Sequence, residues 1–453
     1  MPDSTATPPS TVRRTSGQLI LLLALLTAVG PLSIDLYLPA FPGMAGDLNT
    51  TAAGIQLTMT TFLVGLGLGQ LFIGPLSDGI GRRKPMLIGT FVCAAASVIC
   101  AVAPNVEVLA SARFLQGLGG AAGVVLARAI VSDTSRGAAA AKLLGVLTMI
   151  SVIAPVIGPL AGGGIIAVGG WRMVFWVLAV LVLLMFLGAL FGVREPLPDA
   201  DRNRGGLKTT FRVAGEVLRN RNYTGYLLTF CFAFAGLFAY ISASPFVIQN
   251  IMGLSETRFS LIFAMNALCI TIVSVIAAAL AGKVSYRRMI AIGLVVAILA
   301  AAGLLAFALN GTPMVPMLIL FAAFQGSLGF IFGNATALAL EEAGHHAGTG
   351  SAFLGCLQYV LAAAVAPIVG LGGEDTAVPM GIAMVAFAVL AGVSYLTLTR
   401  KAAGVLVGAL QFGVIAGAPA AGAAVRAGKP ALGAFPAGHL HLAAGHLHLA
   451  AGH

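Results

Sequence analysis

Only 9% of the 453 residues are charged and 59% are hydrophobic, whereas soluble domains carry about 25% charged residues. A chain of this composition cannot cover itself with water-facing side chains, which excludes a soluble globular protein and predicts a polytopic membrane protein. The net charge of +10 indicates membrane topology and contact with anionic lipid rather than nucleic-acid binding.

Apolar runs of about 20 residues, long enough to cross a bilayer as helices, recur along the first 400 residues. The runs are continuous and do not alternate with polar residues, which favours helices over a β-barrel. The sequence therefore predicts an all-α polytopic membrane protein with twelve transmembrane helices in two six-helix halves. The predicted spans are 18–38, 55–75, 85–103, 107–130, 141–167, 172–193, 222–250, 257–281, 287–308, 313–340, 348–371 and 378–399.

The charge distribution predicts the orientation of these spans. With the N-terminus inside, nearly all loop Lys and Arg residues fall on the cytoplasmic side, and the outer loops keep only Arg172 and Arg258. This asymmetry follows the positive-inside rule and places both termini in the cytoplasm. We expect residues 1–16 to be a polar cytoplasmic tail. The alternative, a signal peptide, is disfavoured because no convincing small-residue cleavage site follows the apolar run from Leu19.

Span 1 contains Asp35, the one acidic residue that we place within the hydrophobic part of any predicted span. A charge at mid-bilayer costs about 2.5 kcal/mol or more, so an intramembrane acid indicates a functional site. We expect Asp35 to take up and release a proton. The alternative is a carboxylate at the helix end that reaches the outer interface.

The loop between spans 2 and 3 is densely basic and punctuated by glycines. It resembles the corresponding loop of the major facilitator superfamily, whose pattern is G-x-L-a-D-r-x-G-R-k. Gly79 departs from the pattern, because the family usually has a basic residue there. The matching positions are Gly74, Leu76, Asp78, Gly81 and Arg82.

This resemblance implies the major facilitator fold and a gating role for the loop. Asp78, Arg82 and Asp133 would form a charge network that ties helices 2, 3, 4 and 11 together in the outward-facing state. The alternative is a basic loop that only sets topology, which would account for the arginines but not for Asp78 or the glycine spacing.

Span 4 carries Arg113 within residues 109–120, which resemble the conserved basic motif of that helix in the family. We expect Arg113 to be the counter-charge that stabilises deprotonated Asp35, or to bind a polar group of the substrate. The alternative is an arginine that snorkels to the outer interface.

Span 5 resembles the antiporter motif G-P-x-x-G-G, which marks the exporters of the superfamily. We expect Gly158-Pro159 to interrupt the helix with a bend, and the resemblance implies that this bend seals the pathway against proton leak. The alternative is a packing kink without any effect on gating. The motif residues are Pro155, Gly158, Pro159, Gly162 and Gly163.

Three segments narrow the resemblance to one branch of the superfamily. Residues 31–40, 128–133 and 348–358 resemble the bicyclomycin/chloramphenicol resistance family of drug:proton antiporters. The whole resemblance covers residues 17–400. It implies alternating access with export driven by proton entry.

The chain divides into five predicted parts. A tail (1–16) precedes the first six-helix half (17–193), and a cytoplasmic linker (194–221) with an amphipathic, interfacial helix separates it from the second half (222–400). The loop 280–288 is a degenerate repeat of the loop 74–84, as expected of two parallel repeats. Residues 401–453 form a low-complexity Ala/Gly/His tail, in which a thirteenth span at 403–425 is a minority alternative.

The second half contains no acid in the middle of a span, so neutral polar residues are the remaining candidates for substrate contact. Each is also a plausible hydrogen-bond partner between helices, and we expect one or two of them to touch substrate in an apolar cleft. The full set of candidates is Tyr37, Tyr240, Asn266, Gln325, Asn334 and Gln358.

These observations predict a monomeric exporter of hydrophobic drugs in the cytoplasmic membrane, such as phenicol-like or bicyclomycin-like antibiotics or lipophilic cations. Its partners would be substrate, protons and lipid, and it would use the proton gradient with no cofactor or metal. The sequence has no nucleotide-binding loop, no Ser-His-Asp set and no zinc-ligand spacing, and the five cysteines suggest small core residues. The alternatives are efflux of a metabolite such as an amino acid or sugar, and a non-transporting receptor or scaffold.

Overall fold

The computed structural model describes residues 17–202, 206–370 and 372–399. These residues form helices joined by short loops, and no strand is found among them, so the all-α prediction is confirmed. The predicted N-terminal tail and the low-complexity tail, with its alternative span at 403–425, lie outside the described residues.

The elements follow one another in a simple order. The α-helices are α1 (Gly17–Asp35), α2 (Phe41–Asp47), α3 (Ala52–Ile80), α4 (Arg83–Ala101), α5 (Val106–Thr134), α6 (Gly137–Gly192), α7 (Gly206–Arg219), α8 (Arg221–Phe246), α9 (Glu256–Ala279), α10 (Tyr286–Leu309), α11 (Met314–Ala343), α12 (Ala347–Gly370) and α13 (Val378–Leu398). The short helical segments are η1 (Leu38–Ala40), η2 (Asp199–Asp201), η3 (Val247–Ile251) and η4 (Gly344–His346).

Ten helical segments of the described chain are long and apolar enough to cross a membrane. Two of them, Gly137–Gly192 and Met314–Gly370, contain 56 and 57 residues. A straight helix of that length would measure about 85 Å, far more than the roughly 30 Å of a bilayer core. The first leaves the helical conformation at Gly170 (φ +69°), and the second is broken at η4. Each therefore supplies two crossings, as predicted.

Helix starts follow local capping chemistry, whereas helix ends extend past the apolar runs. The side chains of Thr51, Asn105 and Ser255 accept hydrogen bonds from the first turns of α3, α5 and α9. The loop between spans 2 and 3 is much shorter than expected, because α3 continues to Ile80 and α4 begins at Arg83. Hydropathy marks where the hydrocarbon ends, but the backbone hydrogen bonds continue beyond it.

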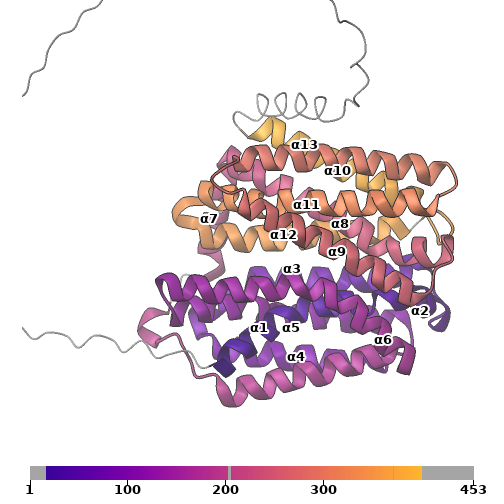
Figure 1. Ribbon diagram of the computed structural model, residues 1–453. Coiled ribbons are helices and arrows are strands. Elements are labelled where there is room, and N and C mark those ends of the chain that lie inside the picture. Colours follow the sequence, from indigo (N-terminus) through magenta and orange to yellow (C-terminus); the bar gives the residue numbers. More distant parts are fainter. Residues whose placement is uncertain (1–16, 203–205, 371, 400–453) are drawn as a thin grey trace, which may run out of the picture. The chain divides into compact units, whose positions relative to one another are not determined.

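The membrane helices form two groups (Figure 1). In the first group α3 packs on α5, α4 packs on α5 and α6, and α1 packs on α6. In the second group α8 packs on α12 and α13, and α11 packs on α9 and α10. The two groups meet mainly where α3 contacts α12 and where α6 contacts α9. Any cavity bounded by these two contacts is shared by both groups.

Helix α7 lies in the predicted linker, where a helix was expected. It contacts α3 of the first group and both α8 and α12 of the second group. Ala214 and Val217 are buried, whereas Arg212, Glu216 and Arg219 are exposed, which is the one-sided pattern of an amphipathic helix. Phe211 is also exposed.

The two ends of the helix bundle differ. We call the end with Arg82, Arg83 and Lys84, where α3 stops and α4 starts, the basic end, and the end with α2 the opposite end. Hydrogen bonds between the two groups lie towards the opposite end, where Gln249 Nε2 donates to the carbonyl of Pro39 (2.9 Å) and Gln56 Nε2 to that of Ser242 (3.0 Å). Towards the basic end, a cavity of about 500 Å³ separates α3 and α5 from the start of α12. The structure is thus closed at the opposite end.

Candidate functional site

A cavity of about 240 Å³ lies between the two groups of helices. Its wall is mostly aromatic and aliphatic, and its few polar residues are Asp35, Ser151, Gln325 and Tyr359. An apolar cavity with a small number of polar groups is typical of a small-molecule site. The apolar lining is Pro31, Ile34, Pro155, Phe234, Leu237, Phe238, Ile241, Phe263, Ala267 and Ile270.

Asp35 is the last residue of α1 and belongs to the wall of this cavity. The residue is 3% exposed, and no hydrogen bond or ion pair to its carboxyl group is found within the described chain. A buried carboxyl group without a partner is costly when charged. Asp35 can therefore hold a proton in this state, or it can pair with a positively charged group inside the cavity.

Arg113 does not form the expected ion pair with Asp35 in this structure. Its guanidinium is fully buried and lies 4.4 Å from the ring centre of Tyr37 and 4.2 Å from that of Phe62. Nη1 donates to Gln116 Oε1, while Nε and Nη2 have no hydrogen-bond partner. Aromatic faces stabilise the cation here. Complete burial also rules out the alternative of an arginine that snorkels to the interface.

The polar candidates for substrate contact separate into two sets. Gln325 lines the cavity, and its Oε1 is buried without a hydrogen-bond partner. Tyr37 packs against Arg113 instead, and Asn266 donates to the hydroxyl of Tyr240 (2.7 Å). The remaining two do not line this cavity: Asn334 donates to the carbonyl of Phe330 (2.7 Å), and Gln358 is only partly buried.

Two polar residues of the cavity, Ser151 and Tyr359, were not predicted from the sequence. Both lie close to predicted site residues, since Ser151 precedes the antiporter motif by one turn and Tyr359 follows Gln358. The signal that could have found Ser151 is its spacing of four residues from Pro155, which puts both residues on one face of the helix.

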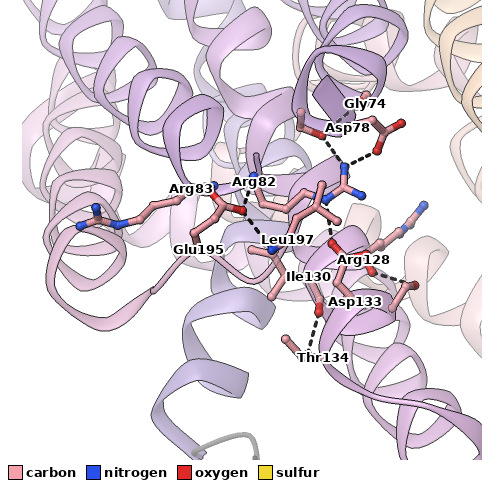
Figure 2. A network of polar contacts seen from close by, with 12 residues as sticks. Gly74, Asp78, Arg82, Arg83, Arg128, Ile130, Asp133, Thr134, Glu195 and Leu197 are labelled. Atoms are coloured by element: carbon pink, nitrogen blue, oxygen red, sulfur yellow. Dashed lines mark hydrogen bonds and ion pairs between the residues drawn. The ribbon is translucent and has the colours of Figure 1, made fainter. Parts of the chain in front are cut away.

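The predicted gating residues form a network at the basic end (Figure 2). Arg82 donates from Nε to Asp133 Oδ2 (2.8 Å) and from Nη1 to both Ser77 Oγ (2.7 Å) and Asp78 Oδ1. The network joins the end of α3 to the start of α4 and to α5. Burial alone would lower the pKa of Arg82, but hydrogen bonds and charge from Asp133 and Asp78 outweigh it and raise the pKa.

The expected link from this network to the eleventh membrane helix, α12, is not present in this state. Asp78 and Arg82 line the cavity of about 500 Å³ at the basic end, and Thr349 and Ser351 of α12 line the same cavity. The side chain of Asp78 is 46% exposed. The cavity keeps α12 apart from the carboxylate.

The turn between α3 and α4 depends on Gly81 and on Glu195, which was not predicted. Gly81 has a φ of +94°, a conformation that glycine adopts without strain. The carboxylate of Glu195 accepts hydrogen bonds from the backbone N–H groups of Arg82 (2.7 Å) and Arg83 (3.0 Å), as Figure 2 shows. It thereby satisfies free donors at the start of α4. Glu195 could have been found from the sequence, because it is an acidic residue that comes directly after the sixth predicted span, on the side of the basic loop.

The antiporter motif packs against α1 around Asp35. Pro155 lines the cavity, Gly158 faces Asp35, and Gly162 faces the carbonyl of Leu36. The expected interruption at Gly158-Pro159 is not found. The helix passes through Pro159, and its one residue with non-helical φ/ψ angles is Gly170, where the chain turns into the next span.

Comparisons with known proteins agree with this architecture. A family model described as Major Facilitator Superfamily matches residues 23–367. The chain is 39% identical over 388 residues to an uncharacterized MFS-type transporter, YdgK, of Bacillus subtilis (strain 168), covering 85% of this chain and 96% of that protein. It is 31% identical over 382 residues to a bicyclomycin resistance protein homolog of Haemophilus influenzae, covering 84% and 96%.

The chain is also similar to a further relative and to a solved structure. Multidrug resistance protein D of Escherichia coli (strain K12) is 27% identical over 395 residues, covering 86% of this chain and 98% of that protein. Among solved structures, a D-xylose-proton symporter superposes with a TM-score of 0.70 at 14% identity, covering 85% of this chain and 98% of that chain. At this level of identity the structural similarity supports the fold alone.

Proposed function

This chain belongs to the Major Facilitator Superfamily and is a multi-pass membrane transporter, and on that basis we propose that it exports lipophilic compounds in exchange for protons. The observation that carries the proposal is the carboxyl group of Asp35, which is buried without a partner in the wall of an apolar cavity. A scaffold or receptor has no need of such a group, whose cost in a membrane is high.

We propose that the basic end faces the cytoplasm, because basic loops are retained on that side of a membrane. Both termini would then be cytoplasmic, in the cytoplasmic membrane of a bacterial cell. The structure, closed at the opposite end, would correspond to an inward-facing state, in which substrate enters from the basic end. One chain supplies the whole cavity wall, so a monomer would suffice.

In the proposed cycle, Asp35 takes up a proton when the cavity opens to the outside and releases it when the cavity opens to the cytoplasm. Arg113 would favour the deprotonated form, because two of its buried nitrogen atoms lack partners and could receive a carboxylate after a rearrangement of α1. Substrate and proton would bind alternately, since both need the cavity around Asp35.

The lining of the cavity supports a lipophilic substrate, neutral or weakly charged. Phenylalanine, leucine and isoleucine side chains dominate it, and a sugar or amino acid would leave most of its hydrogen-bonding groups unsatisfied there. The relatives named for bicyclomycin resistance and multidrug resistance favour bicyclomycin-like antibiotics as first compounds to test, together with the phenicol-like antibiotics that the sequence resemblance implies.

The test combines a resistance screen with a measurement of proton movement. Cells with and without the protein are compared on a panel of antibiotics and lipophilic cations, and drug-driven proton movement is then followed in inverted vesicles. Asp35→Asn keeps the size of the side chain but removes titration, so it should reach the membrane and lose proton movement. Asp35→Glu should retain part of the activity.

Glu107→Gln is the matched control, because Glu107 is exposed in the first turn of α5 and lies away from the cavity. It should behave like the unmodified protein. Undiminished antiport by Asp35→Asn would show that another group carries the proton.

A further inference from the structure

The backbones of α1 and α6 come into close contact at Asp35. A Cβ atom added to Gly158 would lie only 2.7 Å from the Cβ atom of Asp35, and one added to Gly162 would clash with the carbonyl oxygen of Leu36. The two glycines are four residues apart and therefore share one face of α6. The absence of their side chains is what allows α6 to touch α1 at this point.

The position of the Asp35 carboxyl group depends on this contact more than on any polar partner. Within the described chain the carboxyl group has no hydrogen bond or ion pair that would fix its direction. Packing therefore decides where it points, and Gly158 packs directly against its Cβ atom. Pro155, one turn earlier on α6, lines the cavity together with Asp35.

The same stretch of α6 also contacts the second group of helices. A Cβ atom on Gly163 would lie 2.7 Å from Ser260 Oγ of α9, and α9 lines the cavity through Phe263, Ala267 and Ile270. The motif thus contacts α1 through Gly158 and Gly162 and α9 through Gly163, so the two contacts can be changed separately.

We propose that Gly158 and Gly162 are positioning residues for Asp35: by bringing the backbone of α6 against α1, they hold the carboxyl group at the cavity wall and set its access to protons. This inference rests on the proposed function only in assuming that the carboxyl group matters for transport. The geometric part can be measured without any substrate.

The experiment follows the reaction of Asp35 with dicyclohexylcarbodiimide, an apolar reagent that modifies protonated carboxyl groups. Purified, detergent-solubilised full-length protein is labelled over a range of pH, the folded fraction is isolated by size exclusion, and the modified peptide is quantified by mass spectrometry. The unmodified protein should give one pH midpoint for labelling of Asp35.

Gly158→Ala should shift this midpoint by about one pH unit, because its methyl group must displace the side chain of Asp35. Gly162→Ala should act in the same way through Leu36. It provides a second variant if Gly158→Ala yields little protein, and only the folded fraction is scored.

Two variants of the same helix serve as controls. Gly164→Ala adds a methyl group where nothing lies within 4 Å, and Gly163→Ala places one 2.7 Å from the hydroxyl of Ser260 on α9 instead of against Asp35. Neither should move the midpoint. If Gly163→Ala shifts it as much as Gly158→Ala does, the effect is general strain and the proposal is wrong.

The outcome is independent of the test of Asp35→Asn. A midpoint that is unchanged in Gly158→Ala and Gly162→Ala overturns the positioning role, whatever the transport assays give. A shifted midpoint, together with normal antiport by Asp35→Asn, would retain the positioning role and reject Asp35 as the proton carrier.

Discussion

At the scale of single residues, the structure surrounds its two buried ionisable side chains, Asp35 and Arg113, differently. Asp35 faces an apolar cavity without a partner, whereas Arg113 is surrounded by aromatic rings and bonded to Gln116. Gln116 in turn donates to Ser97 Oγ (2.7 Å), which joins α5 to α4. Arg113 cannot lose its proton, so its effect on Asp35 must come through its fixed positive charge.

The first prediction at this scale concerns Arg113. Arg113→Lys keeps the charge but loses the planar group that stacks on Tyr37 and Phe62, so it should retain part of the transport rate. Arg113→Ala should lose nearly all of it and, without its ring contacts, unfold more easily by about 1–2 kcal/mol. Transport in vesicles and thermal unfolding in detergent measure the two effects.

Arg172→Lys is the matched control for the loss of stacking. Arg172 lies 4.1 Å from the ring centre of Trp171 and is remote from the cavity. It should change stability slightly and transport not at all. Normal transport by Arg113→Ala would mean that the buried charge is structural only.

At the scale of elements, the sequence predicts the helices well because each apolar run corresponds to one helix across the hydrocarbon core of the bilayer. Their ends were predicted less well, since α3 continues to Ile80 on backbone hydrogen bonds that hydropathy does not report. The break between spans 5 and 6 was predicted between residues 167 and 172, and it lies at Gly170, but the interruption expected within span 5 at Gly158-Pro159 is not found, because the φ/ψ angles stay helical there. A proline within a packed helix can be accommodated, whereas a positive φ at glycine changes the chain direction.

The site was only partly predictable for the same reason. Asp35 and Gln325 could be found because polar residues inside a span are conspicuous. The rotation of each helix decides which polar residues reach the cavity, and it depends on packing between helices far apart in the sequence. Tyr240 and Asn266 therefore bind each other, and Glu195 looked like one more solvated charge of the linker.

The prediction at this scale concerns the network around Arg82. Asp78→Asn and Asp133→Asn each remove one of its two charged partners, and both should slow transport. We expect Asp78→Asn to favour the state closed at the opposite end. Distances between spin labels in the loop that joins α3 to α4 and in the loop that joins α11 to α12 would report it as a wider opening at the basic end.

The double variant tests whether the two acids form one unit. Because they share Arg82, the effects should be non-additive by about 0.5–3 kcal/mol. Asp199→Asn is the control, since Asp199 pairs with Arg202 and is largely exposed. If transport is lost while the distances equal those of the unmodified protein, the network does not stabilise the outward-facing state.

At the scale of the whole transporter, alternating access requires the two groups of helices to separate at one end while they meet at the other. In this structure they meet at the opposite end through hydrogen bonds and through apolar contacts such as that between Phe41 and Phe246. In both hydrogen bonds the acceptor is a backbone carbonyl. Such hydrogen bonds can break and form repeatedly, because water can replace the donor.

The last prediction concerns Gln249, whose side chain donates to the carbonyl of Pro39 across the two groups. A hydrogen bond of this kind contributes about 0.5–1.5 kcal/mol, which corresponds to a shift of about 2-fold to 10-fold in the equilibrium between the two states. Gln249→Ala should therefore raise the population that is open at the opposite end.

Spin labels in the loops 102–105 and 310–312, in a variant without the five native cysteines, would report this change as a longer distance between the two loops. Asn250→Ala is the control, because the neighbouring Asn250 bonds Glu374 within the second group. Equal distances in the two variants would show that the opposite end is held by apolar packing rather than by this hydrogen bond.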